Sequence, residues 1–255
     1  MFPLVLILLL CIPVYAGAEN VHSNQPPQNN EPEIIKVYRA SDTGLSEITL
    51  DEYNAFLAQE SALESAKQGL LKSEPLFKTD ALFENNSVIT PRDAVLTTIY
   101  SYQQHGYVSY VTKSALTRRI SSSVFNSGTV ESLKPISYSV SQGYIANTNF
   151  DVNAKKSAVS AGITGGGYSW MNTYGDSKST TALVSANRYA WMEYTPIMDN
   201  SFGVITEKTY ANTQGTTVLV GTTSYDVDIY IARLLSGSLP DGVYVIKQSA
   251  TYPGF

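Results

Sequence analysis

The chain has 255 residues, of which 43% are apolar and 15% are charged, and its formal net charge is −5. The few Lys and Arg residues are spread thinly, whereas phosphate binding needs a concentrated basic surface, so we expect no nucleic-acid partner. The apolar fraction is high enough for a core built without disulfides.

The amino terminus predicts export. An apolar run from Leu4 to Ile12 is followed by small residues at Ala16 and Ala18, the pattern of a secretory signal peptide over residues 1–18. The run is shorter than the ~20 residues of a membrane span. Cys11, the single cysteine, lies inside it, which excludes disulfides and thiolate metal sites from the mature chain. We therefore expect a protein that is secreted or associated with the cell surface.

Two further segments precede the predicted main domain. Residues 19–33 are almost entirely polar and predict a disordered leader. Residues 34–90 form a helical N-terminal segment, which starts with a short strand over Glu33–Arg39 and a turn at Ser41–Gly44.

The helix of this segment is the clearest local prediction. Thr49 and Glu52 have the spacing of a capping box, and a helix from Leu50 to about Lys72 should follow. Its apolar stripe is expected to pack on the rest of the protein. The stripe consists of Leu50, Tyr53, Phe56, Leu57, Leu63, Ala66 and Leu70.

Residues 91–255 alternate apolar and small polar residues with the period of a β-strand. We predict a mainly β fold, an antiparallel sandwich or elongated sheet with one N-terminal amphipathic helix. The predicted strands include Val95–Tyr102, Tyr107–Val111, Ile136–Val140, Phe150–Ala154, Val159–Ile163 and Tyr225–Ile231. Turns are expected at Gln103–Gly106, Asp199–Ser201, Asn212–Gly215 and Leu239–Gly242.

The residues of common catalytic sites are scarce. His22 lies in the leader and His105 in a predicted turn, and the nucleophile elbow of serine hydrolases does not occur. The paired carboxylates of a glycoside hydrolase are spaced in three dimensions, so the sequence leaves that class open. We predict a non-enzymatic protein with no cofactor and no metal.

Aromatic residues are abundant, with 18 tyrosines and two tryptophans. The segment Tyr189–Tyr194 is large on both faces, as in a strand covered on two sides or at an interface. Core packing is the first interpretation of this segment. Stacking on a sugar or on the cell wall is the functional one, with Trp170, Tyr189, Trp191 and Tyr194 as candidate binding residues.

From Tyr110 onward, the order of short motifs resembles a group of uncharacterised exported proteins of Gram-positive bacteria, a resemblance that implies export but no activity. The motifs are Val111–Ser114, Ile120–Ser123, Ile136–Ser141, Val159–Thr164, Glu193–Pro196 and Leu239–Tyr244. In its alternation of Ser and Thr with small apolar residues, the chain is also similar to aerolysin-type β-pore formers.

Two functions follow as hypotheses. The first is binding of a cell-wall polymer or a protein partner at the cell surface or in the medium. The alternative is a pore former that inserts a Ser/Thr-rich hairpin from Ile136–Thr206, the one hypothesis that gives the protein a membrane partner. Its alternating runs mostly break after five to seven residues, whereas a transmembrane strand needs ~9 to 11. The sequence does not fix the oligomeric state.

Overall fold

The computed structural model describes residues 31–71, 95–147, 153–163, 173–174, 177–213, 216–233, 235 and 239–254. The predicted signal peptide, nearly all of the predicted leader and Trp170 lie outside these residues. Neither helix of the described chain combines the length and the apolar composition needed to cross a membrane.

One strand organises the fold. The 26-residue β11 (Arg188–Thr213) runs through the main antiparallel sheet. Its first part pairs with β13 (Gly242–Ser249) on one edge, and with β4 (Arg118–Arg119) and β5 (Val124–Asn126). Its second part pairs with β12 (Thr216–Ala232) and with β3 (Val95–Thr112). The fold is therefore mainly β and antiparallel, as the sequence predicted.

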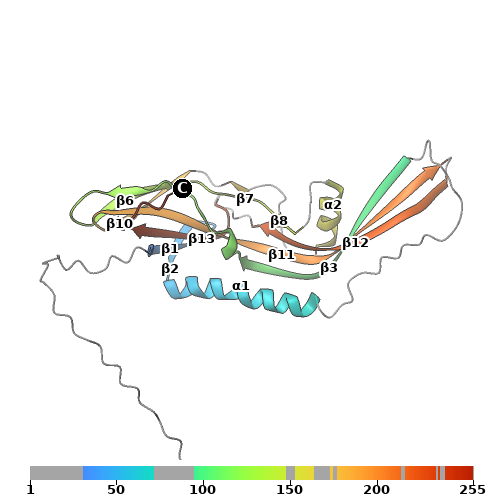
Figure 1. Cartoon of the computed structure of the whole chain (residues 1–255), viewed down its shortest axis with the longest axis horizontal. Helices are drawn as coiled ribbons and strands as arrows, with labels where there is room; N and C mark the ends of the chain where they lie inside the picture. Colours follow the sequence, from blue (N-terminus) through green and yellow to red (C-terminus); the bar gives the residue numbers. More distant parts are fainter. Residues whose placement is uncertain are drawn as a thin grey trace, which may run out of the picture.

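The molecule is long and has two unlike ends (Figure 1). At one end, β1 (Glu33–Ser41) and β2 (Gly44–Ile48) extend the sheet beyond β13, giving the strand order β2-β1-β13-β11-β12-β8. At the other end, β3, β11 and β12 project as a three-stranded ribbon. We call the first end the body.

A second layer covers one face of the body. It contains the pair of β6 (Ser132–Tyr138) with β10 (Lys178–Val184) and the short pair of β7 (Ser141–Gln142) with β9 (Thr173–Tyr174). Between β7 and β9 the chain passes through β8 (Ile145–Ala146), which pairs with β12 of the main sheet. The predicted alternation is confirmed in β6, where Ile136 and Tyr138 are buried and Ser137 is exposed.

Helix α1 (Leu50–Leu71) covers the opposite face (Figure 1). The predicted helix is confirmed, and part of its predicted stripe packs on the sheet, although Leu50 is 51% exposed. Its capping box is formed: the Thr49 amide donates to the Glu52 carboxylate at 2.7 Å, and the Glu52 amide donates to Thr49 Oγ1 at 3.2 Å. Tyr53 of the helix packs with Ile197 and Val243 of the sheet.

Near the C-terminal end of α1, Lys67 is buried and donates to Asp228 at 2.7 Å and to the Tyr230 hydroxyl at 2.9 Å. The 3₁₀ turn η1 (Ser114–Leu116) comes farther along the chain, just after β3.

The strand predicted at Val159–Ile163 is wrong, because these residues lie in and directly after helix α2 (Asn153–Gly162). Ala154, expected in another strand, lies in the same helix, and residues 150–152 are outside the described part. Val159 and Ile163 are four residues apart, a spacing that suits one face of a helix as well as one face of a strand. Both are buried in one cluster with Tyr102 and Ile229.

The turn predicted at Gln103–Gly106 is also wrong. β3 is one strand from Val95 to Thr112, and His105 is an exposed strand residue. Bulges let the strand continue: the register with β11 shifts between Met198 and Asn200 and again between Phe202 and Gly203. A side chain at Gly203 would place its Cβ 2.1 Å from the Gln103 carbonyl oxygen, so this approach of two strands requires glycine.

The turn predicted at Asp199–Ser201 lies in the middle of β11 instead. The buried Asn200 side chain donates to the Asp228 carboxylate at 2.7 Å and to the Ile229 carbonyl at 3.0 Å. The buried Asp199 carboxylate accepts from Arg233 at 2.7 Å. These side chains bond to β12 and to Arg233 directly after it, although the Asn200 side-chain oxygen has no partner among the described residues, and these contacts continue the strand instead of turning it.

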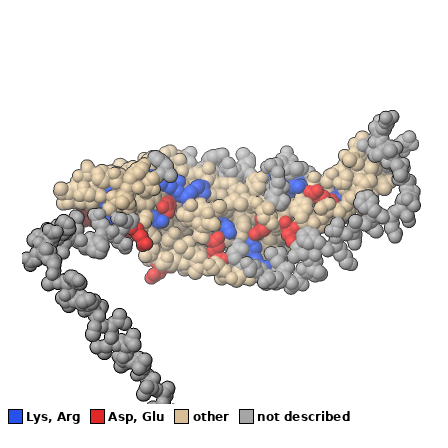
Figure 2. All heavy atoms as spheres, viewed as in Figure 1, with Lys and Arg blue, Asp and Glu red and all other residues tan. Residues whose placement is uncertain are grey.

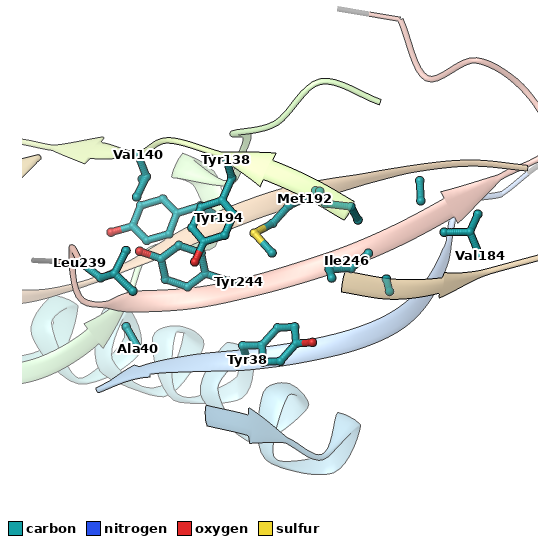
Figure 3. Packing of buried hydrophobic residues seen from close by; sticks show 13 residues of the cluster. Tyr38, Ala40, Tyr138, Val140, Val184, Met192, Tyr194, Leu239, Tyr244 and Ile246 are labelled. Carbon is teal, nitrogen blue, oxygen red and sulfur yellow. The ribbon is translucent and has the colours of Figure 1, made fainter. Parts of the chain in front are cut away.

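The body core is rich in tyrosine. The rings of Tyr138, Tyr194 and Tyr244 lie together between the two layers (Figure 3), with centroids 5.9 Å apart for Tyr138 and Tyr244 and 5.0 Å for Tyr194 and Tyr244. The Tyr194 hydroxyl donates to the Asp241 carbonyl at 2.8 Å, and the Tyr244 hydroxyl donates to the Pro240 carbonyl at 2.9 Å. Burial raises the pKa of both phenols well above the ordinary value.

Candidate functional site

The two faces of β11 have different roles in the body. Ala190, Met192 and Tyr194 point into the tyrosine-rich core. Because side chains alternate along a strand, Tyr189, Trp191 and Glu193 lie on the other face. Helix α1 packs farther along that face, against Ile197 of β11 and Val243 of β13. The Tyr189–Glu193 part of this face is the candidate functional site.

Three aromatic rings meet at one end of the site. Phe125 of β5, Tyr189 of β11 and Tyr252 of the C-terminal segment form what we call the aromatic platform. The Phe125 and Tyr189 centroids are 4.5 Å apart, and the Tyr189 and Tyr252 centroids are 5.4 Å apart in an edge-to-face arrangement. Phe125 is 44% exposed and Tyr252 is 50% exposed. The platform therefore holds large aromatic surfaces in contact with water at fixed positions.

A hollow of about 310 Å³ lies beside the platform; we call it the Trp191 pocket. The Trp191 Nε1–H donates to Glu193 at 2.8 Å, and the other Glu193 oxygen pairs with Lys247 at 2.8 Å. The Arg119 guanidinium lies 5.9 Å from the Trp191 ring centroid and donates to the Gly254 carbonyl, which holds the C-terminal segment over the pocket. The lining residues are Pro32, Arg119, Trp191, Glu193, Ser249, Thr251, Pro253 and Gly254.

A second, more open hollow of about 550 Å³ also borders Arg119; we call it the serine groove. Its floor comes from β6 and from the chain after β4, which bridge at Ser121 and Tyr138. The Arg119 Nε–H donates to the Ser121 carbonyl at 2.8 Å, which fixes the guanidinium between the two hollows. The lining residues are Arg119, Ile120, Ser121, Ser122, Ser137, Tyr138, Ser139 and Ser177.

The four candidate binding residues are not brought together. Tyr189 lies in the platform, and Trp191 lines the pocket although only 3% of it is exposed. Tyr194 points into the core, where its ring cannot contact a ligand at the surface (Figure 3). Trp170 lies outside the described residues. Sequence reasoning missed Phe125, Tyr252 and Arg119, and no local pattern in the chain connects these three positions.

The site offers aromatic faces, hydroxyl groups and one guanidinium. Glu193 is the one carboxylate among the described residues that line the two hollows, and both of its oxygens are bonded. Within the described residues, no group of three or more His, Cys, Asp or Glu side chains could hold a metal ion. Apolar walls with a few placed polar groups are the usual features of a binding site for small or polymeric ligands.

Comparison of this chain with protein-family models, with curated proteins and with solved structures finds no match in any of the three.

Proposed function

We propose that this protein binds a polymer of sugar units, such as a cell-wall glycan, along the aromatic platform and the two hollows that meet at Arg119. The observation that carries the proposal is the platform itself, in which three rings from three separate elements are held in contact and two of them, Phe125 and Tyr252, are exposed to water. Exposed aromatic patches of this kind mark interaction sites. A sugar ring presents an apolar C–H face that can stack on such rings.

The polar groups suit the same class of ligand. Five serines line the groove, and each hydroxyl can both donate and accept a hydrogen bond. Arg119 brings a guanidinium to both hollows, and arginine beside aromatic residues is typical of the strongest contacts in interfaces. Platform, pocket and groove follow one another over the surface, an arrangement that suits several units of a chain better than one small molecule.

Retention on purified Gram-positive cell walls tests this proposal. The variant Phe125→Ala/Tyr252→Ala removes the exposed rings of the platform and should lower the bound fraction at least tenfold. Val130→Ala, at an even more exposed apolar residue outside the site, is the control and should bind like the unchanged protein. Equal retention of all three proteins would contradict the proposal.

Treating the walls with protease before the assay separates a glycan from a protein partner. Retention on protease-treated walls, and competition by soluble wall glycan fragments, are the expected results. If protease treatment abolishes retention while the platform variant is still impaired, the partner is a protein and the glycan assignment is wrong.

The alternative of a β-pore former has one structural feature in its favour. The pairs β6–β10 and β7–β9 make much of the segment from Ser132 to Val184 an antiparallel layer outside the main sheet, although β8 within it pairs with β12. One face is buried against the body and the other carries Ser137 and Ser139. To form a membrane hairpin, this layer would have to leave the body and extend, including helix α2.

A disulfide lock tests the alternative. The Ser121–Tyr138 bridge is antiparallel, so Ser122 lies opposite Ser137, close enough for a disulfide after substitution by cysteine. If the layer must detach, oxidised Ser122→Cys/Ser137→Cys protein should not release dye from liposomes, and reduction should restore release. Liposomes that stay intact with the unmodified protein would eliminate the pore hypothesis.

A further inference from the structure

The far part of the three-stranded ribbon is unlike the rest of the molecule. We call Val95–Ile99 of β3, Lys208–Asn212 of β11 and Thr217–Thr222 of β12 the distal ribbon. The three strands are paired at the same level, because Thr209 pairs with Thr98 on one side and with Gly221 on the other, and the pairing with β12 shifts by one residue between Thr209 and Tyr210. Figure 1 shows this part projecting beyond the body and beyond α2.

Both outer edges of the distal ribbon are open among the residues that the structure describes. On the β12 side, β8 pairs at Ile229 and Tyr230, and the Asn147 side chain bonds the backbone at Asp228, but no described strand pairs nearer the tip. On the β3 side, Gly162 of α2 packs closely against the Tyr102 backbone. No described strand pairs with the outer edge of Val95–Ile99. Two rows of backbone donors and acceptors therefore face outward at the same level of the ribbon.

Apart from a register shift in β12 opposite Thr209 and Tyr210, the open edges carry none of the usual protection against pairing. Edge strands of soluble proteins are commonly blunted by Lys, by Pro or by other inward-pointing charges. Neither the β3 nor the β12 part of the distal ribbon contains a charged residue or a proline. On the face shown in Figure 2, the charged side chains lie over the body and the near part of the ribbon, and the described far end is free of them.

Apolar side chains are exposed on both faces of the distal ribbon. Because directly paired residues share a face, Leu96 and Val218 lie on one side with Ala211, whereas Val95 and Leu219 lie on the other. Val95, Leu96, Ile99, Val218, Leu219 and Val220 are between 48% and 67% exposed. A partner that docks on one face would leave the apolar residues of the other face in water. A strand added at the edge of the ribbon would instead contact the apolar residues of both faces.

We infer that the distal ribbon joins copies of this protein, with the open edge of β3 in one copy pairing with the open edge of β12 in the next. A second copy is the partner because each molecule presents one edge of each kind at the same level of the ribbon. β3 and β12 both run antiparallel to β11, so they run parallel to each other. Copies related by a rotation around an axis therefore meet through a parallel pair. Such a head-to-tail contact builds a ring if the rotation closes, and a chain if it does not.

Two charged edge variants test this inference independently of ligand binding. Leu96→Lys/Ile99→Lys blocks the β3 edge, and Val218→Lys/Val220→Lys blocks the β12 edge. The matched control is Val130→Lys/Leu133→Lys, at exposed apolar residues in the body. Sedimentation velocity of the mature protein from about 1 to about 100 µM covers the range of ordinary specific association. Unchanged and control proteins should form oligomers, and each edge variant alone should be monomeric.

Mixing the two edge variants is the decisive step, since each still has the edge that the other lacks. An equimolar mixture should form dimers and nothing larger. A monomeric unchanged protein at every concentration overturns the inference, and so does a β12-edge variant that still assembles, because β3 would then pair with itself. If the unchanged protein is monomeric but cosediments with phosphatidylcholine and phosphatidylglycerol vesicles, the apolar ribbon contacts lipid and the pairing is wrong.

Discussion

The two halves of β11 share a backbone pattern and differ in what covers them. From Arg188 to Gly203 and from Val204 to Thr213, the strand is paired on both edges along most of its length. In the body half, a second layer covers one face and α1 with the C-terminal segment covers much of the other, and most residues are buried. In the ribbon half most are intermediate or exposed. The hydrogen bonds between paired strands are therefore similar in the two halves of β11. The halves differ in buried area, and this difference should decide their local stability.

The same substitution in each half gives the largest contrast. Tyr194→Ala leaves a cavity in the body core and should lower the free energy of unfolding by about 3–5 kcal/mol. Tyr210→Ala, in the ribbon half, should cost about 1 kcal/mol or less because the ring is only partly buried. Urea unfolding of both variants measures the difference, and similar losses would show that the ribbon is as well packed as the body.

The junction of the two halves depends on a buried ion network. The Asp241 carboxylate is fully buried and accepts from Arg39 and, at 2.8 Å, from Arg233, which also pairs with Asp199. Asp241→Ala should cost about 2–3 kcal/mol, near the lower limit for a broken buried pair because both arginines keep some contact with water.

The control for the ion network is the surface pair Lys36–Glu47. Lys36→Ala should change the free energy of unfolding by less than about 0.5 kcal/mol. Equal effects of Asp241→Ala and Lys36→Ala in urea unfolding would mean that the network does not hold the junction.

Alkaline pH should weaken the body. Burial keeps the phenols of Tyr194 and Tyr244 protonated in the folded protein, whereas in the unfolded chain a tyrosine pKa is about 10. The resulting stability is fully present below that pH and is lost as the pH rises above it, by about 1.4 kcal/mol per pH unit for each such tyrosine. Tyr244→Phe removes one of the two phenols, so the loss of stability per pH unit should fall by the contribution of one tyrosine. Unfolding followed between pH 9 and about 11.5, where phenol ionisation is also visible by absorbance, measures it; an unchanged slope would contradict the burial argument.

A small effect is expected for the helix that covers the body. Thr49→Ala removes the hydroxyl that accepts from the Glu52 amide and should cost about 1 kcal/mol. Ser65→Ala, within the same helix and exposed, should be neutral or slightly stabilising because alanine is the better helix former. Thermal unfolding of the pair measures both, and a neutral Thr49→Ala would mean that α1 starts without its cap.

The sequence predicted the elements whose signals are local. The capping box at Thr49 and Glu52 predicted α1, and the period of two predicted β6 and β12. The strand prediction failed at Val159 and Ile163, because a spacing of four residues is compatible with both helix and strand. It also placed a turn at Asp199–Ser201, where the partners that keep the strand straight are Asp228, Ile229 and Arg233, about 30 residues away along the chain.

The candidate site was predicted only in part for a related reason. The abundance of aromatic residues in Tyr189–Tyr194 was visible, but which of them reach the surface depends on segments distant in sequence. Tyr189 meets Phe125 and Tyr252, whereas Trp191, on the same face, is covered by the C-terminal segment and by Arg119. Tyr194, on the other face, lies in the core.

Hydrogen exchange along β11 tests the central comparison most directly. At about 1 µM, below the range expected for weak association, amides of Trp191–Asn200 should exchange only through global unfolding. Amides of Lys208–Asn212 should exchange through local opening of the ribbon, at least a hundredfold faster. Equal protection along the whole strand at this concentration would contradict the account. The ribbon half would then be as stable as the body half, although most of its residues are only partly buried or exposed.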